Sequence, residues 1–402
     1  MVKKKMIKFS VRTKGKIQIN NIMKTVKNRN IILLSLFAAL SLFFLMEKKF
    51  VSGLISKQTE DKNLRILGSV ISLIKEDYVE PPDPSKTMDG SFKGLVDSLD
   101  GYSCYLEKNS IDLFNARINN QLYSPGMFIY KRHGSFPVVI GLKEDSPAAK
   151  MGIKIGDTIS TLNGTSTLLM NMEEANLALL SKDPGTIKIK ILGIGEDKEI
   201  EVARNKMSKN PYSFKSADLV SGILSIHNFS PPLSSSIKKT VVPNLKKQNS
   251  PLVIDLRNCT AGDIEEARMF INLFLKKDII GYLDGKETDK DLSCLETAEL
   301  DTIPLIIWIN QATIGPAEIA AGVLQKFRNS KVIGLQSPGF TAKRDFIPLD
   351  DGSALLLATW IFRFNEKETL WMTGVKPDKE IEPEAQTEAL YLQATQNFLS
   401  QM

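Results

Sequence analysis

The strongest constraint on the fold is a regular alternation of short apolar runs and amphipathic segments across residues 251–335. The runs PLVIDLRN (251–258) and PLIIWIN (304–310) are rich in β-branched residues and have the length of fully buried strands. Each precedes a segment with helical spacing of its apolar residues, DIEEARMFINLFLK (263–276) and PAEIAAGVLQKFR (316–328). Strands alternating with helices form a mostly parallel sheet with right-handed crossovers. The sequence therefore predicts an α/β domain, assigned to residues 207–402.

Residues 121–206 have a different character, with short β-rich runs such as PVVIGL and TIKIKILG separated by turns. The segment DSPAAKMGIKIGDTISTLNGTS places Gly152 and Gly156-Asp157 around a short helix and ends near Asn163-Gly164. This order of elements resembles a PDZ domain. The resemblance implies that the domain takes an extended polypeptide C-terminus as an added strand.

The same resemblance implies a peptide-binding loop at Ser124-Pro125-Gly126-Met127, followed by a strand and flanked by a helix at about 173–181. Pro125 removes one of the expected amide donors. We expect the ligand to meet the following residues: Gly126, Met127, Phe128, Ile129 and Leu179. The alternative interpretation is that these side chains only pack the domain.

The N-terminal region, residues 1–56, combines a basic segment with an apolar run. Residues 1–30 hold ten Lys or Arg and no acid, and residues 31–46 (IILLSLFAALSLFFLM) are uncharged. The run is slightly short for a spanning helix, and its basic flank predicts a cytoplasmic N-terminus with the body outside. We expect residues 31–46 to anchor the chain in the inner membrane of a bacterial cell envelope. Cleavage as a signal peptide, and a true start at Met23, remain alternatives.

The charge and cysteine content exclude several classes of function. Without the ten basic residues of 1–30, the remaining chain has 42 basic and 46 acidic residues, so no nucleic-acid partner is expected. The three cysteines are scattered, and their spacing favours neither a disulfide framework nor a zinc site. Neither a metal nor another cofactor is expected.

Residues 57–120 are expected to form a helical leader. Apolar residues follow helical spacing over 59–84 until Pro81-Pro82, and a second helix is expected at about 88–99.

Taken together, residues 60–400 resemble the carboxyl-terminal processing proteases, also called tail-specific proteases. The resemblance rests on segments in the family's order: LIKEDYVEPPD, SLDGYSCYLEK, the PDZ-like segment, PLVIDLRNCTAGDIEEARMFINLFL, INQATIGPAEIAAGVLQKFRNSKVIG, LDDGSALLLAT and TGVKPDKEIEP. It implies a core of the ClpP/crotonase kind. It also implies a serine nucleophile at a strand-to-helix turn (S-A-S-A-S-E) and a lysine base about 25 residues later.

Placed on that pattern, this chain lacks the groups that perform the reaction. The nucleophile position is Gly315, and the next residue, Pro316, has no N–H to stabilise an oxyanion. The lysine position is Phe340, and a glutamine position four residues later is Arg344. The resemblance also implies a second oxyanion donor from a glycine pair, and this pair corresponds to Ala261-Gly262. Gly315, Pro316 and Glu318 nevertheless suit a helix start.

Three functions remain open on this basis. The first is a membrane-anchored pseudoprotease that binds polypeptide C-termini or an envelope protein through the PDZ groove. The second is an active serine-type endopeptidase, cleaving near protein C-termini, with a relocated Ser/Thr-Lys site. Its candidates are Thr313, Ser337 and Lys343, although Lys343 is expected to face away from the site. His227 is expected to be a core or edge histidine, and His133 to be a solvated residue of a hairpin turn. The third is small-molecule binding by the vacated cleft.

Overall fold

The computed structural model describes residues 62–118, 122–132, 134–193, 195–217, 220–245, 250–383 and 386–400. The chain divides into two compact units, residues 1–84 and 85–402. The expected membrane segment, residues 31–46, and the alternative start at Met23 lie outside the described residues. No helix within the described ranges has the length and apolar character needed to cross a membrane.

The first unit contains the helix α2 (Lys62–Asp77), which confirms the helix predicted over 59–84. It ends before the Pro81-Pro82 pair, as expected from the missing N–H groups of proline. None of the residues of α2 is buried, and its leucine, isoleucine and valine side chains are largely exposed.

The second unit begins with the segment expected as a helical leader. It contains α3 (Pro84–Asp97), which confirms the helix predicted near 88–99, and α4 (Lys108–Ile118). Between them lies a short buried strand, β1 (Cys104–Leu106). This strand pairs with residues 354–356, far along the chain, so the leader segment contributes a strand to the α/β part of the protein.

Residues 122–206 form a small β-rich module with its own apolar core. Its strands are β2 (Tyr123–Ser124), β3 (Met127–Tyr130), β4 (Val138–Leu142), β5 (Ile159–Leu162), β6 (Thr165–Ser166), β7 (Gly185–Ile191) and β8 (Lys198–Lys206). Its helices are α5 (Pro147–Lys150) and α6 (Met172–Ala178). One sheet has the order β2-β8-β7-β5-β6, and β3 pairs with β4 in a separate hairpin.

The α/β part is built on a sheet of order β19-β15-β14-β11-β10-β9. Its strands are β9 (Tyr212–Ala217), β10 (Val220–Ile226), β11 (Leu252–Asp255), β14 (Leu305–Ile309), β15 (Lys331–Gly334) and β19 (Lys379–Glu380). All neighbouring pairs run parallel except β9 with β10. The predicted parallel sheet is therefore confirmed, and β11 and β14 are buried at every position, as expected for strands covered on both faces.

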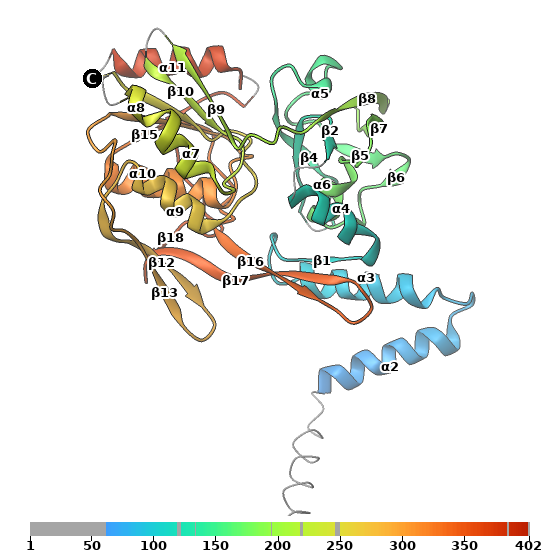
Figure 1. The fold of residues 1–402 in the computed structure, drawn as a ribbon. Helices are drawn as coiled ribbons and strands as arrows, with labels where there is room; N and C mark the ends of the chain where they lie inside the picture. The colour runs from blue at the N-terminus through green and yellow to red at the C-terminus, as the bar shows by residue number, and fades with distance from the viewer. Residues whose placement is uncertain are drawn as a thin grey trace, which may run out of the picture. The chain divides into compact units, whose positions relative to one another are not determined.

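Helices cover both faces of this sheet (Figure 1). Those on one face are α7 (Leu233–Thr240), α8 (Val242–Leu245), α9 (Ile264–Asn272) and α10 (Pro316–Arg328). The C-terminal helix α11 (Glu388–Leu399) packs on the opposite face, where Tyr391 lies beside Trp308. This three-layer arrangement places the carboxyl ends of β11 and β14 next to each other, which is where the candidate site forms.

A second, antiparallel sheet has the order β1-β17-β12-β13, and β16 and β18 also pair with β17. Its strands are β12 (Lys277–Gly285), β13 (Asp289–Cys294), β16 (Ala342–Pro348), β17 (Ala354–Asn365) and β18 (Glu368–Thr369), together with β1. The segment that leads into β16 contains Phe340, so this sheet brings a second chain segment to the turn before α10.

Candidate functional site

The turn between β14 and α10 has the backbone of a strand-to-helix elbow. The strand ends at Ile309, the helix begins at Pro316, and Gly315 occupies the N-cap position. Gly315 has φ 67° and ψ −119°, a conformation that is nearly restricted to glycine. A sharp, strained turn of this kind is how several hydrolases expose a nucleophile above a sheet. The helix start predicted at 315–316 is therefore confirmed, together with the proline at the first helical position.

The space at Gly315 is open for a side chain. A Cβ atom built there would lie 3.7 Å from the carbonyl oxygen of Phe340 and 3.7 Å from the hydroxyl of Tyr102, which are ordinary contacts. The position thus has room for a serine but carries no attacking atom. Pro316, directly after it, has no backbone N–H to offer a developing oxyanion.

The carboxyl group of Glu318 ties this turn to the segment before β16. It accepts hydrogen bonds from the amides of Gly315 (2.9 Å), Gly339 (2.6 Å) and Phe340 (2.8 Å), and the Ser337 side chain also bonds to it. The group is completely buried. Burial raises the pKa of Glu318 to about 7, although each of these hydrogen bonds acts in the opposite direction. One carboxyl group therefore holds together the family's nucleophile and base positions.

Phe340 lies in an aromatic cluster where the family pattern has a lysine. Its side chain is buried and stacks on the ring of Tyr102, with centroids 4.9 Å apart and planes inclined by 5°. Tyr130 of the β-rich module and Trp371 also lie against it, with centroid distances of 5.9 and 6.5 Å. An aromatic ring cannot accept a proton from a nucleophile, so this position supplies packing in place of a base.

Arg344 also contacts the ring of Tyr102. Its guanidinium lies 4.0 Å from the centroid of the Tyr102 ring and donates to the Tyr102 carbonyl at 3.1 Å. It also donates to Glu173 on α6 at 3.2 Å. Burial lowers the pKa of Arg344, but the nearby Tyr102 and Glu173 outweigh it and leave the pKa above its ordinary value. Arg344 therefore stays charged and serves as a contact between the core and the module.

The glycine-pair position, Ala261-Gly262, lies in an exposed loop after β11. The Ala261 carbonyl accepts from the amide of Phe229 at 3.0 Å, and the backbone of Gly262 packs against Phe229. The same loop reaches the elbow, because the amide of Ile314 donates to the carbonyl of Cys259 at 2.9 Å. The loop expected to supply an oxyanion donor thus lies beside the nucleophile position.

The side chains considered for a relocated site are engaged elsewhere. The buried Thr313 hydroxyl accepts from the Asn310 amide and donates to the Leu256 carbonyl, both at 2.9 Å. Ser337 accepts from the amide of Val375 at 2.8 Å. Lys343 is half exposed and pairs with Asp345 at 2.8 Å. The structure does not assemble a nucleophile and a base from these three residues.

Two further titratable groups considered near this part of the fold have shifted pKa values. His227 follows β10, and burial lowers its pKa, as does Lys143, against an opposing effect of Asp255. Burial raises the pKa of the Cys259 thiol to about 12, so almost no thiolate exists at neutral pH. His133 lies outside the described residues.

The residues expected to bind a peptide fall into two groups. Met127, Ile129 and Leu179 are buried together in the core of the module. Phe128 is half-buried, and the Gly126 amide donates to the Ser124 hydroxyl at 3.1 Å. Within the described part of the module β3 pairs with β4 alone, so the opposite edge of β3 has no strand against it.

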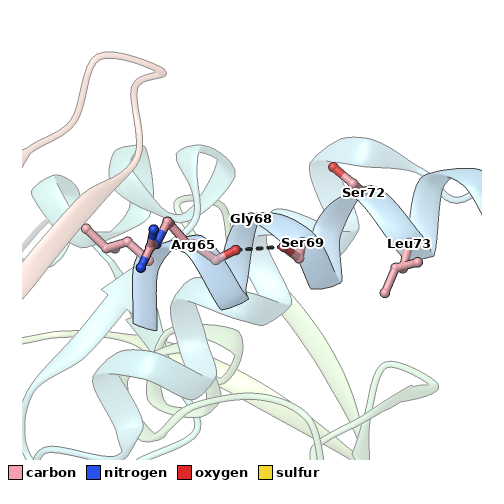
Figure 2. A pocket seen from close by; sticks show the side chains of 6 residues that line it. Arg65, Gly68, Ser69, Ser72 and Leu73 are labelled. Carbon is pink, nitrogen blue, oxygen red and sulfur yellow. Dashed lines mark hydrogen bonds between the residues drawn. The ribbon is translucent and has the colours of Figure 1, made fainter. Parts of the chain in front are cut away.

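A shallow concave surface on α2 carries no comparable arrangement. It is lined by Leu64, Arg65, Gly68, Ser69, Ser72 and Leu73, and Figure 2 shows that these side chains come from the helix alone. The Ser69 hydroxyl is already bonded to the Arg65 carbonyl at 2.9 Å. Across the described ranges, no group of His, Cys, Asp or Glu side chains is arranged to hold a metal ion.

Sequence reasoning missed Tyr102, Tyr130, Glu173 and Trp371 as members of the site. Tyr102 lies in the turn DGYSCY, and 242 positions separate it from Arg344. The only available signal was an aromatic residue in a loop segment of the family pattern, and no local periodicity connects it with residue 340.

Comparison with known proteins agrees with this architecture. The model of peptidase family S41 matches residues 221–381. The carboxy-terminal processing protease CtpA of Bacillus subtilis (strain 168) is 26% identical over 374 residues, covering 92% of this chain and 80% of the relative. A probable CtpA-like serine protease of Staphylococcus aureus (strain COL) is 24% identical over 356 residues, covering 88% and 71%. The solved photosystem II D1 C-terminal processing protease has the same fold, with a TM-score of 0.65 at 19% identity over 79% of this chain and 87% of that one. Residues 221–381 therefore match peptidase family S41, and the chain is similar over most of its length to carboxyl-terminal processing proteases.

Proposed function

We propose that this chain is a non-catalytic member of the family, a binding or regulatory module of the cell envelope. The observation that carries the proposal is the geometry at Gly315 and Phe340. The elbow has a strained backbone and room for a side chain at residue 315. The nucleophile position is nevertheless a glycine without a side chain, and the base position is the stacked ring of Phe340. The frame for the reaction is present without the reacting groups.

The groups for three separate chemical roles are missing, so a substitute for one of them would not restore catalysis. A nucleophile, a base and an oxyanion donor each contribute orders of magnitude to acyl-transfer rates. Gly315, Phe340 and Pro316 lack the corresponding atoms. The engagement of Thr313 and Ser337 in backbone hydrogen bonds further supports the absence of a substitute nucleophile.

We propose further that the module of residues 122–206 is a PDZ domain that binds polypeptide C-termini. The support is its closed core, its order of strands and helices, and the edge of β3 that has no strand against it in the described residues. An extended peptide would add to that edge beside α6. Because the Gly126 amide already bonds to Ser124, and Pro125 has no N–H, we expect weak capture of a carboxylate.

For the location, we propose that residues 31–46 anchor the chain in the cytoplasmic membrane with the body on the outer side. The support is the uncharged run itself, the ten basic residues that precede it, and the bacterial origin of the relatives.

A peptidase assay tests the proposed loss of activity. The purified full-length chain is incubated with unstructured proteins that have apolar C-termini, and the products are followed by mass spectrometry. No turnover is expected. Turnover that the wild-type chain shows and that Lys343→Ala abolishes would falsify the proposal in favour of a relocated site. Turnover that is unchanged in Lys343→Ala and Thr313→Ala and disappears in independently purified protein comes from a contaminating peptidase, whereas turnover that persists in that protein would also contradict the proposal.

A peptide titration tests the binding role. Fluorescent peptides with an apolar, free C-terminus are compared with the same peptides carrying a C-terminal amide. Saturable binding that favours the free carboxylate is expected. Equal binding of both forms, or none at millimolar concentration, contradicts recognition of C-termini, whatever the outcome of the peptidase assay.

A further inference from the structure

The first turn of α6 is held by charged residues from three other elements. Glu173 is buried and pairs with two arginines, Arg344 of β16 and Arg117 of α4. Glu174, next to it, pairs with Lys93 on α3 at 2.8 Å. The helix of the binding module is thus tied at one end to both the leader segment and the α/β core.

Tyr102 connects these ion pairs to the vacated catalytic positions. Its ring stacks on the ring of Phe340 and also contacts the guanidinium of Arg344. A planar guanidinium stacks on an aromatic face and donates to a carboxylate at the same time, which neither a glutamine nor a lysine side chain does equally well. Phe340 and Arg344 therefore both contact Tyr102, and Arg344 also pairs with Glu173 of the module.

We propose that Phe340 and Arg344 form an interdomain clamp that holds α6 of the module docked on the core through Tyr102 and Glu173. Positions 340 and 344 correspond to the lysine and the glutamine of the family pattern. In this chain we infer that they hold the module of residues 122–206 in place. The clamp does not depend on whether the module binds peptides, and it survives if the proposed function fails.

The buried thiol of Cys104 provides a probe of docking. Cys104 is 2% exposed and packs in one apolar cluster with Leu177 of α6 and Leu356 of β17. If α6 leaves the core, this thiol becomes accessible to a reagent. Cys294, buried in β13, is remote from the contacts of the clamp and reports on unfolding of the core itself.

The experiment measures the labelling rates of individual cysteines in the full-length chain with iodoacetamide, resolved by peptide mass spectrometry. Arg344→Gln is expected to accelerate labelling of Cys104 at least about tenfold and to leave the rate at Cys294 unchanged, because the docking contact is weakened. Burial raises the pKa of the Cys104 thiol and Arg344 lowers it, so the loss of Arg344 alone would slow the labelling, and an acceleration reports exposure. Arg363→Gln is the matched control. Arg363 pairs with Asp284 within the second sheet, so its loss is expected to leave the rate at Cys104 unchanged.

Two results would overturn the clamp. One is an unchanged rate at Cys104 in Arg344→Gln, and the other is a parallel increase at Cys104 and Cys294, which would indicate general destabilisation.

A second variant approaches the same contact from the module. Glu173→Gln is expected to accelerate labelling of Cys104 as well, and the double variant with Arg344→Gln should label less than multiplicatively faster than the two single variants, because both changes remove the ion pair between Arg344 and Glu173. Independent effects that multiply in the double variant would contradict the proposal. Arg344→Lys keeps the charge without the planar face and is expected to give an intermediate rate.

Discussion

The ring of Tyr102 lies flat on the ring of Phe340, with centroids 4.9 Å apart and planes 5° apart. The hydroxyl of the same tyrosine lies 3.7 Å from the place where a side chain at position 315 would begin. The leader segment therefore supplies a residue to both the nucleophile and the base positions of the family pattern. This contact explains why a large apolar side chain at position 340 is compatible with the fold.

Phe340→Ala is expected to lower the free energy of unfolding by about 3–5 kcal/mol, the usual result of deleting a buried aromatic ring. The ring is 1% exposed and touches three other aromatic side chains. Phe346→Ala, which deletes a ring that is 40% exposed, serves as the control and should lose less than half as much. Chemical denaturation of both variants measures the difference, and equal losses would contradict the packing role of Phe340.

Gly315→Ser is expected to destabilise the protein by about 1–3 kcal/mol through backbone strain alone, because the site has room for the side chain while φ is +67°. Gly90→Ser, at an open helical position of α3 without a positive φ, should change stability by less than about 0.5 kcal/mol or raise it. Chemical denaturation of Gly315→Ser and Gly90→Ser, each compared with wild type, measures the two changes in stability. We also expect no peptidase activity from Gly315→Ser, since Phe340 and Pro316 remain.

Glu318 should make stability decrease as the pH rises. Its pKa in the folded protein is about 7, above the ordinary value for a glutamate, so the folded state holds a proton that the unfolded state releases first. This contribution is fully present below the ordinary pKa and is lost as the pH passes through about 7. It amounts to about 3 kcal/mol, from about 1.4 kcal/mol for each pH unit. Denaturation of wild type and Glu318→Gln at pH 4.5 and pH 8 measures it.

The free energy of unfolding of Glu318→Gln should lack this part of the pH dependence. The difference in unfolding free energy between wild type and the variant should therefore change with pH. A difference that stays constant from pH 4.5 to pH 8 would show that Glu318 ionises with the same pKa in the folded and unfolded states.

Thr313→Val is expected to lower stability by about 1–3 kcal/mol, because the buried hydroxyl makes two hydrogen bonds and its loss leaves the Asn310 amide without this acceptor. Thr359→Val removes a hydroxyl that bonds to Asp345 near the surface and should cost clearly less. If Thr313→Val is as stable as wild type, the hydroxyl is not structural, and its availability for chemistry would have to be reconsidered.

The local features of the elbow were predictable because they depend on neighbouring residues. The helix 316–328 was expected from its apolar spacing and from Gly315, Pro316 and Glu318 at its start, and the structure has it at the same bounds. The strands 251–258 and 304–310 were expected from β-branched runs and appear as β11 and β14. Each of these elements follows from propensity, periodicity and capping within a few turns of chain.

The sequence by itself determined the parallel α/β architecture, and it placed Gly315, Phe340 and Pro316 at the positions where the family resemblance predicts a nucleophile, a base and an oxyanion donor. Only the tertiary structure decided what those positions do instead. Tyr102, Glu173 and the pair Phe340 and Arg344 come from three separate segments, and their contacts arise from sheet pairing and side-chain packing between parts of the chain that are distant in sequence. Contacts of this kind leave no period or spacing in a single sequence, because the geometry that joins them exists only after the layers have packed.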